Sequence, residues 1–259
     1  MSSPPLFTVY TNDCVSSHPS VSFIKFSDDT AILCLMDTES NTSVYKQEVN
    51  SFVQWCEDHH LTVNTKKTEE MVFDPGNVGD HTPLRIDNVD IAQVDSYKYL
   101  GVHIDNNLTW NTHVHSVCTK VQQRMHFLRR LRVFGVHQKV MMLFYRAVIE
   151  SVFRYAISVW FGNLTLTWKS QINRLAHTAM KVMGVRGHST LQTIFEETVL
   201  RNAKKIIAEP SHILYSEYEL LPSGRRYRVP VKNRNRHLNR YKFSFIPISV
   251  KLVNSDMSR

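Results

Sequence analysis

Two adjacent carboxylates stand at a predicted turn near the start of the chain. Asp28 and Asp29 separate two short runs of β-forming residues, 23–26 and 30–35, so we expect them at the tip of a tight hairpin. Like charges at such short range repel each other unless a cation lies close by. Carboxylate oxygens suit Mg²⁺, and enzymes of phosphoryl transfer hold two such ions about 3.5 to 4 Å apart. The pair is therefore a candidate metal site, although the same pattern is also typical of a solvated turn.

Length and composition indicate a folded protein of one large or two modest domains. The chain has 259 residues, of which 42% are apolar, enough to build hydrophobic cores. Its four cysteines form no Cys-x-x-Cys pair, which argues against a disulfide framework and a zinc knuckle. The longest apolar stretch, residues 140–161, contains Arg146, Glu150 and Arg154, so we expect no membrane contact. The first residues lack the features of a secretory signal, and we expect an intracellular protein, either nuclear or cytoplasmic.

The positive charge of the chain is concentrated at its carboxy-terminal end. The formal net charge is +8, and residues 224–259 contain ten Lys or Arg residues against one acidic residue, so the remainder is close to neutral. Such a segment is typical of contact with a polyanion, because each cation at a phosphate releases counterions. A merely solvated tail is the alternative. The candidate nucleic-acid-binding residues are Arg225, Arg226, Tyr227, Arg228, Arg234, Arg236, Arg240 and Lys242.

Aromatic residues are interleaved with these cations. Tyr227, Tyr241, Phe243 and Phe245 have the spacing that lets bases stack on rings while cations follow the phosphates. The same rings could instead pack against the preceding helices, and the sequence leaves both interpretations open.

The first part of the chain has the pattern of short strands around one helix. A helix is predicted from Asn41 or Ser43 to about residue 60, strands at 61–63, 71–73 and 97–104, and a hairpin over 84–95 with its bend at Asp87-Asn88. After Trp110 the apolar residues recur with helical spacing. We expect four helices, at 112–134, 136–161, 167–183 and 190–208, followed by an extended or partly ordered segment from residue 220.

These patterns predict an α+β protein in three parts. Residues 1–110 form a small body of hairpins and one helix, residues 111–209 a helical bundle, and residues 210–259 a basic, partly disordered carboxy-terminal segment.

Several motifs together resemble the reverse transcriptases of non-LTR (LINE-type) retrotransposons, from the Asp-Asp box onward. Residues 26–30, Phe-Ser-Asp-Asp-Thr, are similar to the Phe-Ala-Asp-Asp-Thr box of that family, with Ser27 in place of Ala. Residues 3–13 resemble the stretch that comes after the family's Pro-Gln-Gly box, and residues 55–69 resemble its next box. Residues 97–113 resemble the primer-grip hairpin and the residues that come directly after it. Further similar motifs lie at 127–131, 144–145, 150–151, 160–163 and 221–228, in the family's order.

The resemblance implies a fold, an activity and roles for individual residues. It implies a partial polymerase palm, an α-helical thumb and a basic tail, with RNA-templated addition of deoxynucleotides to a primer as the reaction. Asp28 and Asp29 become the Mg²⁺ ligands, and Lys67 the candidate acid that protonates the leaving pyrophosphate. Tyr99, Leu100 and Gly101 become the primer grip. The implied partners are an RNA or DNA template-primer and a deoxynucleoside triphosphate.

The family also places a further metal-binding aspartate, the Pro-Gln-Gly box and the fingers before the point at which this sequence opens. We therefore expect a truncated RNA-directed DNA polymerase that is inactive alone and at most binds nucleic acid.

Two other functions remain open at this stage. One is a non-catalytic nucleic-acid-binding remnant. The other is an iron dioxygenase, a class that includes enzymes that repair alkylated DNA. Its facial triad has the pattern that His103-x-Asp105 forms with His237. The helical residues 128–163 could match the non-catalytic amino-terminal region of such a repair protein. Four other histidines that invite a metal interpretation, His59, His60, His113 and His115, fit surface or helix-face positions better than a metal site.

Overall fold

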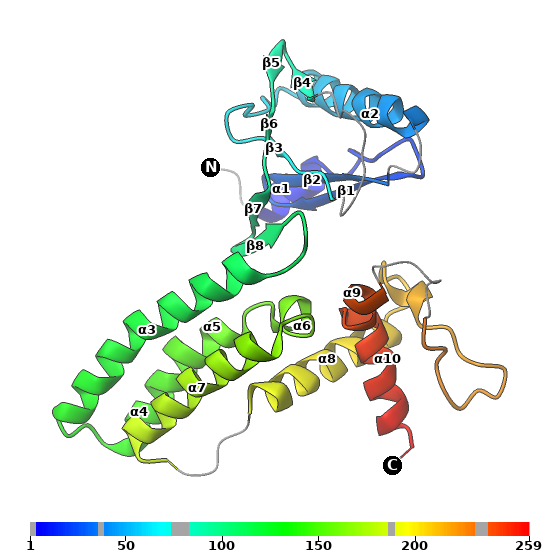
Figure 1. Ribbon diagram of the computed structural model, residues 1–259. Coiled ribbons are helices and arrows are strands. Elements are labelled where there is room, and N and C mark those ends of the chain that lie inside the picture. Colours follow the sequence, from blue (N-terminus) through cyan, green and yellow to red (C-terminus); the bar gives the residue numbers. More distant parts are fainter. Residues whose placement is uncertain (1–3, 36–38, 74–82, 186–189, 231–237, 259) are drawn as a thin grey trace. The chain divides into compact units, whose positions relative to one another are not determined.

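The computed structural model describes residues 4–35, 39–73, 83–185, 190–230 and 238–258 (Figure 1). The chain divides into two compact units, Met1–Tyr97 and Lys98–Arg259. The mixture of helices with small sheets agrees with the predicted α+β class. No helix within the described ranges has the length and apolar character needed to cross a membrane.

The first unit combines two helices with short strands. A two-stranded antiparallel hairpin, a parallel pair and a second small hairpin make up its sheets. The elements are α1 (Pro4–Tyr10), β1 (Val21–Phe26), β2 (Asp29–Cys34), α2 (Glu39–Asp58), β3 (Glu69–Glu70), β4 (Arg85–Ile86), β5 (Val89–Asp90), β6 (Ala92–Gln93) and the start of β7 (Ser96–Tyr99).

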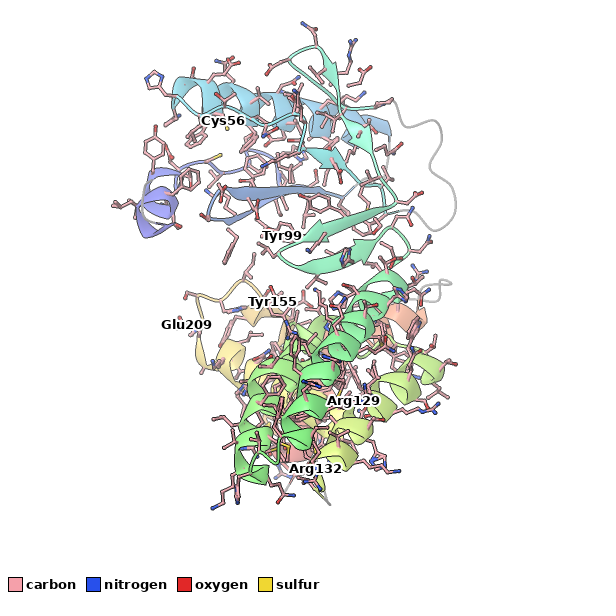
Figure 2. The ribbon with its side chains drawn as sticks, turned by 90° about the vertical axis from the view of Figure 1, so that its left-hand side faces the viewer. Cys56, Tyr99, Arg129, Arg132, Tyr155 and Glu209 are labelled. Carbon is pink, nitrogen blue, oxygen red and sulfur yellow. The ribbon has the colours of Figure 1, made fainter. Side chains whose placement is uncertain are left out.

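One face of the β1–β2 hairpin is covered, and the other is exposed. Side chains alternate along a strand, so Phe23 lies on the covered face, where its ring meets that of Phe52 on α2 at 5.6 Å. Ile24 and Phe26 lie on the opposite face and are exposed. The core between α2 and the strands consists of Tyr45, Val49, Leu84, Ile86 and Ile91. Cys56 of α2, labelled in Figure 2, is also buried, and burial raises the pKa of its thiol to about 11.

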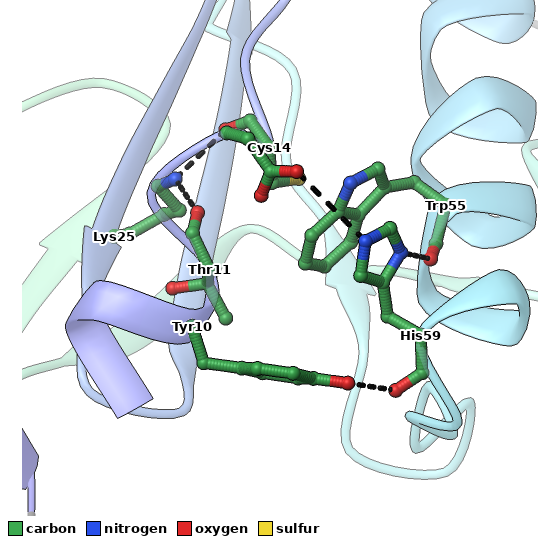
Figure 3. Close-up of polar contacts among 7 residues, drawn as sticks. Tyr10, Thr11, Cys14, Lys25, Trp55 and His59 are labelled. Carbon is green, nitrogen blue, oxygen red and sulfur yellow. Dashed lines mark hydrogen bonds and ion pairs between the residues drawn. The ribbon is translucent and has the colours of Figure 1, made fainter. Parts of the chain in front are cut away.

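Helix α1, which the sequence did not predict, is attached to the hairpin and to the end of α2 (Figure 3). The Lys25 ammonium on β1 donates to the backbone oxygens of Thr11 and Cys14, the latter at 2.8 Å. The Tyr10 hydroxyl donates to the backbone oxygen of His59 at 2.6 Å. The His59 ring stacks on Trp55 at 4.0 Å. His59 therefore has a packing role at the end of α2.

A buried carboxylate ties the loop before β1 to α2. Glu48 is buried and accepts hydrogen bonds from the Ser16 hydroxyl at 2.9 Å, the Ser17 amide at 3.2 Å and the Ser17 hydroxyl. Burial by itself raises the pKa of Glu48, but these hydrogen bonds outweigh it and hold the pKa below its usual 4.5. The ionised side chain thus fixes the start of the hairpin.

The predicted strands of this unit are only partly confirmed. The bend at Asp87-Asn88 is confirmed, because both residues have positive φ between the paired strands β4 and β5. The predicted strands at 61–63 and 71–73 are wrong, since the structure has only the two-residue β3 in this region. The single strand predicted over 97–104 is instead two strands around a turn, because Leu100 and Gly101 both adopt positive φ.

The second unit is helical. Its elements are the end of β7, β8 (Val102–Asp105), α3 (Asn111–Val133), α4 (Gln138–Phe144), the π-helix η1 (Tyr145–Glu150), α5 (Ser151–Arg154), α6 (Ile157–Trp160), α7 (Leu166–Met183), α8 (Leu191–Ala208), the 3₁₀ turn η2 (Tyr215–Glu217), α9 (Leu238–Lys242) and α10 (Phe245–Asp256). Thr165 and Thr190 cap α7 and α8 through their hydroxyls, and the left-handed Gly184 ends α7. These two helices and α3 agree with the prediction to within a residue or two.

The single helix predicted over 136–161 is wrong, because the chain is interrupted twice. The π-helix inserts a wider turn, and the Arg124 guanidinium of α3 donates to the backbone oxygen of Val148 within it. The helix then breaks, with Tyr155 extended and Ala156 left-handed at φ 49°. The buried Trp160 indole donates to the Tyr155 carbonyl at 3.0 Å. It thus provides a donor for a carbonyl oxygen at the point where the helix ends.

The carboxy-terminal segment packs on the bundle. Helix α10 buries Val250 and Val253 against Ala203 and Ile206 of α8. The Tyr218 and Ser249 hydroxyls form a buried hydrogen bond of 2.7 Å. The expectation of an extended tail is therefore wrong for residues 245–256, where the apolar face of a helix is covered. The backbone comes so close to Gly162 that an added Cβ would lie 2.3 Å from the Phe243 oxygen.

His113 is a buried histidine on α3. Its side chain is 3% exposed, its Nδ1 accepts a 3.3 Å hydrogen bond from the His103 amide, and its ring lies 5.3 Å from that of Trp160. Burial lowers the pKa of His113 to about 4, with smaller contributions from His103 and Lys120. The folded unit thus holds a neutral imidazole.

This burial predicts a loss of stability in mild acid. As the pH falls below 6.5, the unfolded chain binds a proton at His113 that the folded chain does not bind, and the free energy of unfolding decreases until about pH 4. The full effect is on the order of 3 kcal/mol. Urea unfolding between pH 7 and pH 5 should show this slope in the natural chain and a flatter one in His113→Gln. Glu48 contributes only below about pH 4.5, so an equal slope in both proteins above pH 5 would contradict the prediction.

Candidate functional site

The structure places Asp28 and Asp29 at the bend of the β1–β2 hairpin, as predicted. Phe26 pairs with Asp29, so Ser27 and Asp28 form a two-residue loop, and Asp29 begins β2. Ser27 adopts φ 54°, a left-handed conformation that tight hairpins use and that is costly for a residue with a side chain. Both carboxylates are exposed. Two consecutive residues at this bend thus expose carboxylate oxygens to solvent.

Lys67 lies elsewhere in the same unit, on the turn after α2. Its backbone amide donates to the Asn64 oxygen at 3.0 Å, and its side chain is exposed. Within the described ranges, no hydrogen bond or ion pair joins Lys67 to either aspartate. The three residues predicted to act in catalysis are thus not joined by a direct polar contact.

The hairpin carboxylates have the chemistry of Mg²⁺ ligands, but they form only part of a site. Carboxylate oxygens without nitrogen or sulfur neighbours fit a hard divalent cation. Among the described residues, no three His, Cys, Asp or Glu side chains gather closely enough to hold a metal. Two carboxylates supply fewer oxygens than a hexacoordinate Mg²⁺ takes, so further ligands would have to come from water or from other groups.

The predicted primer-grip residues form the tip of the β7–β8 hairpin, and the broken helix holds this tip. The Tyr155 hydroxyl donates to the Leu100 backbone oxygen, and its ring lies 3.4 Å from the position of a Cβ added at Gly101. Tyr99 and Tyr155 are both labelled in Figure 2. Gly101 has φ 84°, so a side chain there would be strained as well as crowded. Sequence reasoning did not single out Tyr155, whose position depends on the break at Ala156.

Asp105, the acid of the dioxygenase pattern, has a structural role in the hairpin that leads into α3. Its carboxylate accepts hydrogen bonds from the Thr109 amide at 2.9 Å and the Trp110 amide at 2.9 Å, and it therefore fixes the turn that leads into α3. Trp110 has φ 64°, a conformation that is unfavourable for so bulky a residue and is held here by this turn and by burial. His237, the third member of the pattern, lies outside the described residues.

The basic carboxy-terminal residues are distributed over a turn and a short helix. Leu220 bridges to Tyr227, and Asn254 on α10 binds both backbone groups of Tyr227, at 2.8 and 2.9 Å. Arg225 and Arg226 are exposed at the end of this loop, which we call the basic turn (residues 221–228). Arg228 pairs with Glu219 at 3.2 Å. Arg240 and Lys242 lie on α9, and Arg234 and Arg236 lie outside the described residues.

The aromatic residues of this segment behave differently from one another. Tyr227 and Phe245 pack against the hydrophobic core of α8 and α10. Phe243 is 45% exposed. For Tyr227 and Phe245, the interpretation as packing residues is therefore confirmed over that of open stacking platforms.

Comparison with known proteins identifies the relatives of this chain. Residues 1–104 match the family model described as reverse transcriptase (RNA-dependent DNA polymerase). The chain is 26% identical over 183 residues to the probable RNA-directed DNA polymerase from transposon BS of Drosophila melanogaster. This chain is related to the reverse transcriptases of non-LTR retrotransposons. The predicted relationship is confirmed, and it spans both units.

The matching segments are short relative to the reverse transcriptases themselves. The transposon BS match covers 66% of this chain and 20% of that protein. The RNA-directed DNA polymerase from mobile element jockey of Drosophila melanogaster is 23% identical over 197 residues, which cover 70% of this chain and 21% of that protein. The Pol polyprotein from type-1 retrotransposable element R1 2 of Nasonia vitripennis is 25% identical over 149 residues, with 54% of this chain and 36% of that protein covered. The chain thus spans about a fifth of the length of the two Drosophila relatives.

A second family model matches part of the helical unit. Residues 110–151 match the model described as alkylated DNA repair protein alkB homolog 8, N-terminal. These residues form α3, α4 and the π-helix, so the match concerns helices and not the His103-x-Asp105 pattern. No solved structure matches the chain significantly.

The contact between Tyr155 and the β7–β8 hairpin can be tested directly. In Tyr155→Phe the Leu100 oxygen loses its donor, and we expect a loss of at most about 1 kcal/mol in the free energy of unfolding, because the bond is exposed to solvent. Amide hydrogen exchange at residues 99–102 should become faster. Tyr215→Phe, which alters an exposed tyrosine elsewhere in the unit, is the matched control. Equal exchange in all three proteins would show that the hydroxyl does not hold the tip.

Proposed function

We propose that this chain supplies the Asp-Asp hairpin and a nucleic-acid-binding helical unit of a retrotransposon RNA-directed DNA polymerase. Asp28 and Asp29 act as metal ligands, and Lys67 as the acid at the pyrophosphate leaving group. The observation that carries the proposal is the display of two consecutive carboxylates at the bend of a tight hairpin, inside the segment that matches the reverse transcriptase model. Divalent metal bound there supplies charge stabilisation for phosphoryl transfer.

The residues of the chain have separate tasks in this function. The Lys25 and Glu48 contacts hold the hairpin in a fixed relation to α1 and α2, which keeps the carboxylates in place. The β7–β8 tip, with Tyr99, Leu100 and Gly101, positions the primer end, and Tyr155 holds that tip to the helices. The template-primer, a deoxynucleoside triphosphate and Mg²⁺ are the proposed partners. The basic turn and α9 provide phosphate contacts.

A non-catalytic binding role is the second candidate. It is favoured by the partial nature of the metal site, because two carboxylates at one hairpin bend offer too few oxygens for two hexacoordinate ions. Both candidates predict nucleic-acid binding, and they differ in whether Asp28 matters.

The metal role of the hairpin is tested by titration with Mn²⁺, which broadens nearby NMR signals. We expect the amide signals of residues 26–30 to broaden first. Asp28→Asn should reduce this broadening about tenfold or more, since one of two ligands is removed. Asp87→Asn is the matched control, because Asp87 is a single exposed carboxylate at the bend of the β4–β5 hairpin. Equal broadening at both hairpins would reject the metal site.

A primer-extension assay tests the reaction. With a primed RNA template, Mg²⁺ and all four deoxynucleotides, we expect the 259-residue chain to bind the substrate and to leave the primer unextended, because the hairpin provides only part of a two-metal site. Extension by the natural chain would contradict this expectation. If extension occurred and persisted in Asp28→Ala, the assignment of Asp28 would be wrong as well.

The phosphate contacts of the basic turn are tested by salt dependence. Deleting the whole segment is unsuitable, since α10 forms part of the core with α8. We instead expect the double substitution Arg225→Ser and Arg226→Ser to reduce the slope of log K against log salt by about 0.7 to 0.9 for each arginine that binds a phosphate. Arg85→Ser, on the β4–β5 hairpin, is the control. An unchanged slope would assign binding to other cations.

A further inference from the structure

The helix α3 exposes aromatic side chains that the core does not use. Phe127 is 59% exposed and Phe134, at the end of the helix, is 68% exposed. In contrast, Tyr227 and Phe245 of the basic segment pack against the core. Helix α3 thus offers two open rings, both more exposed than Phe243 of the basic segment, which is 45% exposed.

These two rings lie on one stripe with an arginine between them. Residues 127, 130 and 134 are spaced by three and four positions, so they share the face opposite the buried Val121, Met125 and Leu128. The Arg130 guanidinium lies over the Phe134 ring at 5.0 Å. Phe127 and Phe134 are about 10 Å apart along the helix axis, from a rise of 1.5 Å per residue.

The sequence on both sides of this stripe carries positive charge and no acid. Residues 106–149 contain seven Lys or Arg residues and no Asp or Glu. Arg124 is used inside the unit, at the π-helix. The other cations of α3, Lys120, Arg129, Arg130 and Arg132, are exposed, and Arg129 and Arg132 are labelled on this helix in Figure 2. The next acid, Glu150, is buried and bonded to Arg154.

We propose that the outer face of α3 binds single-stranded nucleic acid. Bases stack on Phe127 and Phe134, and the phosphates between them contact Arg130 and its neighbouring cations. An exposed ring accepts the face of any unpaired base, whereas the bases of a duplex present no free face. The axial distance of about 10 Å corresponds to about three base steps of 3.4 Å. A polyanion also neutralises the cations, while an apolar protein surface would leave them without partners.

This site is distinct from the Asp-Asp hairpin and does not require it. Its ligand is recognised by stacking and charge alone, so the class of ligand is an unpaired DNA or RNA strand without base specificity. In a polymerase-related chain such a face would hold a strand outside the duplex.

The experiment is fluorescence anisotropy with a labelled twelve-nucleotide thymidine strand, an RNA of the same length and a blunt duplex. We expect Phe127→Ala and Phe134→Ala each to weaken single-strand binding about tenfold, and Phe134→Trp to retain it. Arg130→Gln should lower the slope of log K against log salt by about 0.7. The matched control is Leu166→Ala, which removes an 85% exposed apolar side chain outside the stripe.

Three results would overturn the proposal. One is unchanged affinity after removal of both rings in proteins whose circular dichroism and thermal unfolding match the natural chain. Another is duplex binding that depends on the rings as strongly as single-strand binding. The last is a ring-dependent self-association in sedimentation without an effect on the strand, which would make the face a contact between copies. The Mn²⁺ titration at residues 26–30 tests the hairpin by a separate readout, so failure of the hairpin assignment and failure of this site are distinguishable.

Discussion

The helical unit depends on the break between Tyr155 and Ala156. A continuous helix would carry the backbone through this point with every carbonyl bonded inside the helix. Instead the Trp160 indole takes the Tyr155 carbonyl, and the Tyr155 hydroxyl reaches the Leu100 carbonyl at the tip of the β7–β8 hairpin. Because of the break, the Tyr155 side chain contacts the β7–β8 hairpin. The break also brings Trp160 and Phe161 into the core and leaves Gly162 open to the close approach of the Phe243 backbone.

The hairpin of the first unit is held by polar contacts as well as by packing on one face. One face of β1–β2 is covered by α2, while Ile24 and Phe26 on the other face are exposed. Its position depends on the Lys25 ammonium, which binds two backbone oxygens of the α1 turn, and on the ionised Glu48 at the preceding loop. Hydrogen bonds of this kind are strong because one partner is charged and both are partly shielded from water. They hold the two aspartates at a defined bend without burying them.

The distribution of cations is different from what net charge suggests. The excess charge is concentrated in the carboxy-terminal segment, yet part of that segment is a helix in the core, and its aromatic rings Tyr227 and Phe245 face inward. The α3 region has no acid from residue 106 to 149, while the acids of the first unit offset its charge in any sum over the whole chain. A count over long segments therefore hides a local positive face. The acid-free stretch is the signal in the sequence that could have revealed it.

The sequence by itself determined the features that depend on neighbours along the chain. The Asp-Asp bend, the bend at Asp87-Asn88, the helices α3, α7 and α8 and the relationship to retrotransposon reverse transcriptases can be derived from local patterns and motifs. Only the tertiary structure decided the break at Ala156, the role of Tyr155, the burial of His113 and the docking of α10, since each depends on a partner far away in the sequence. It also decided which aromatic residues are exposed, because a ring's burial is set by the surface that another helix brings to it. Local periodicity carries no information about such partners.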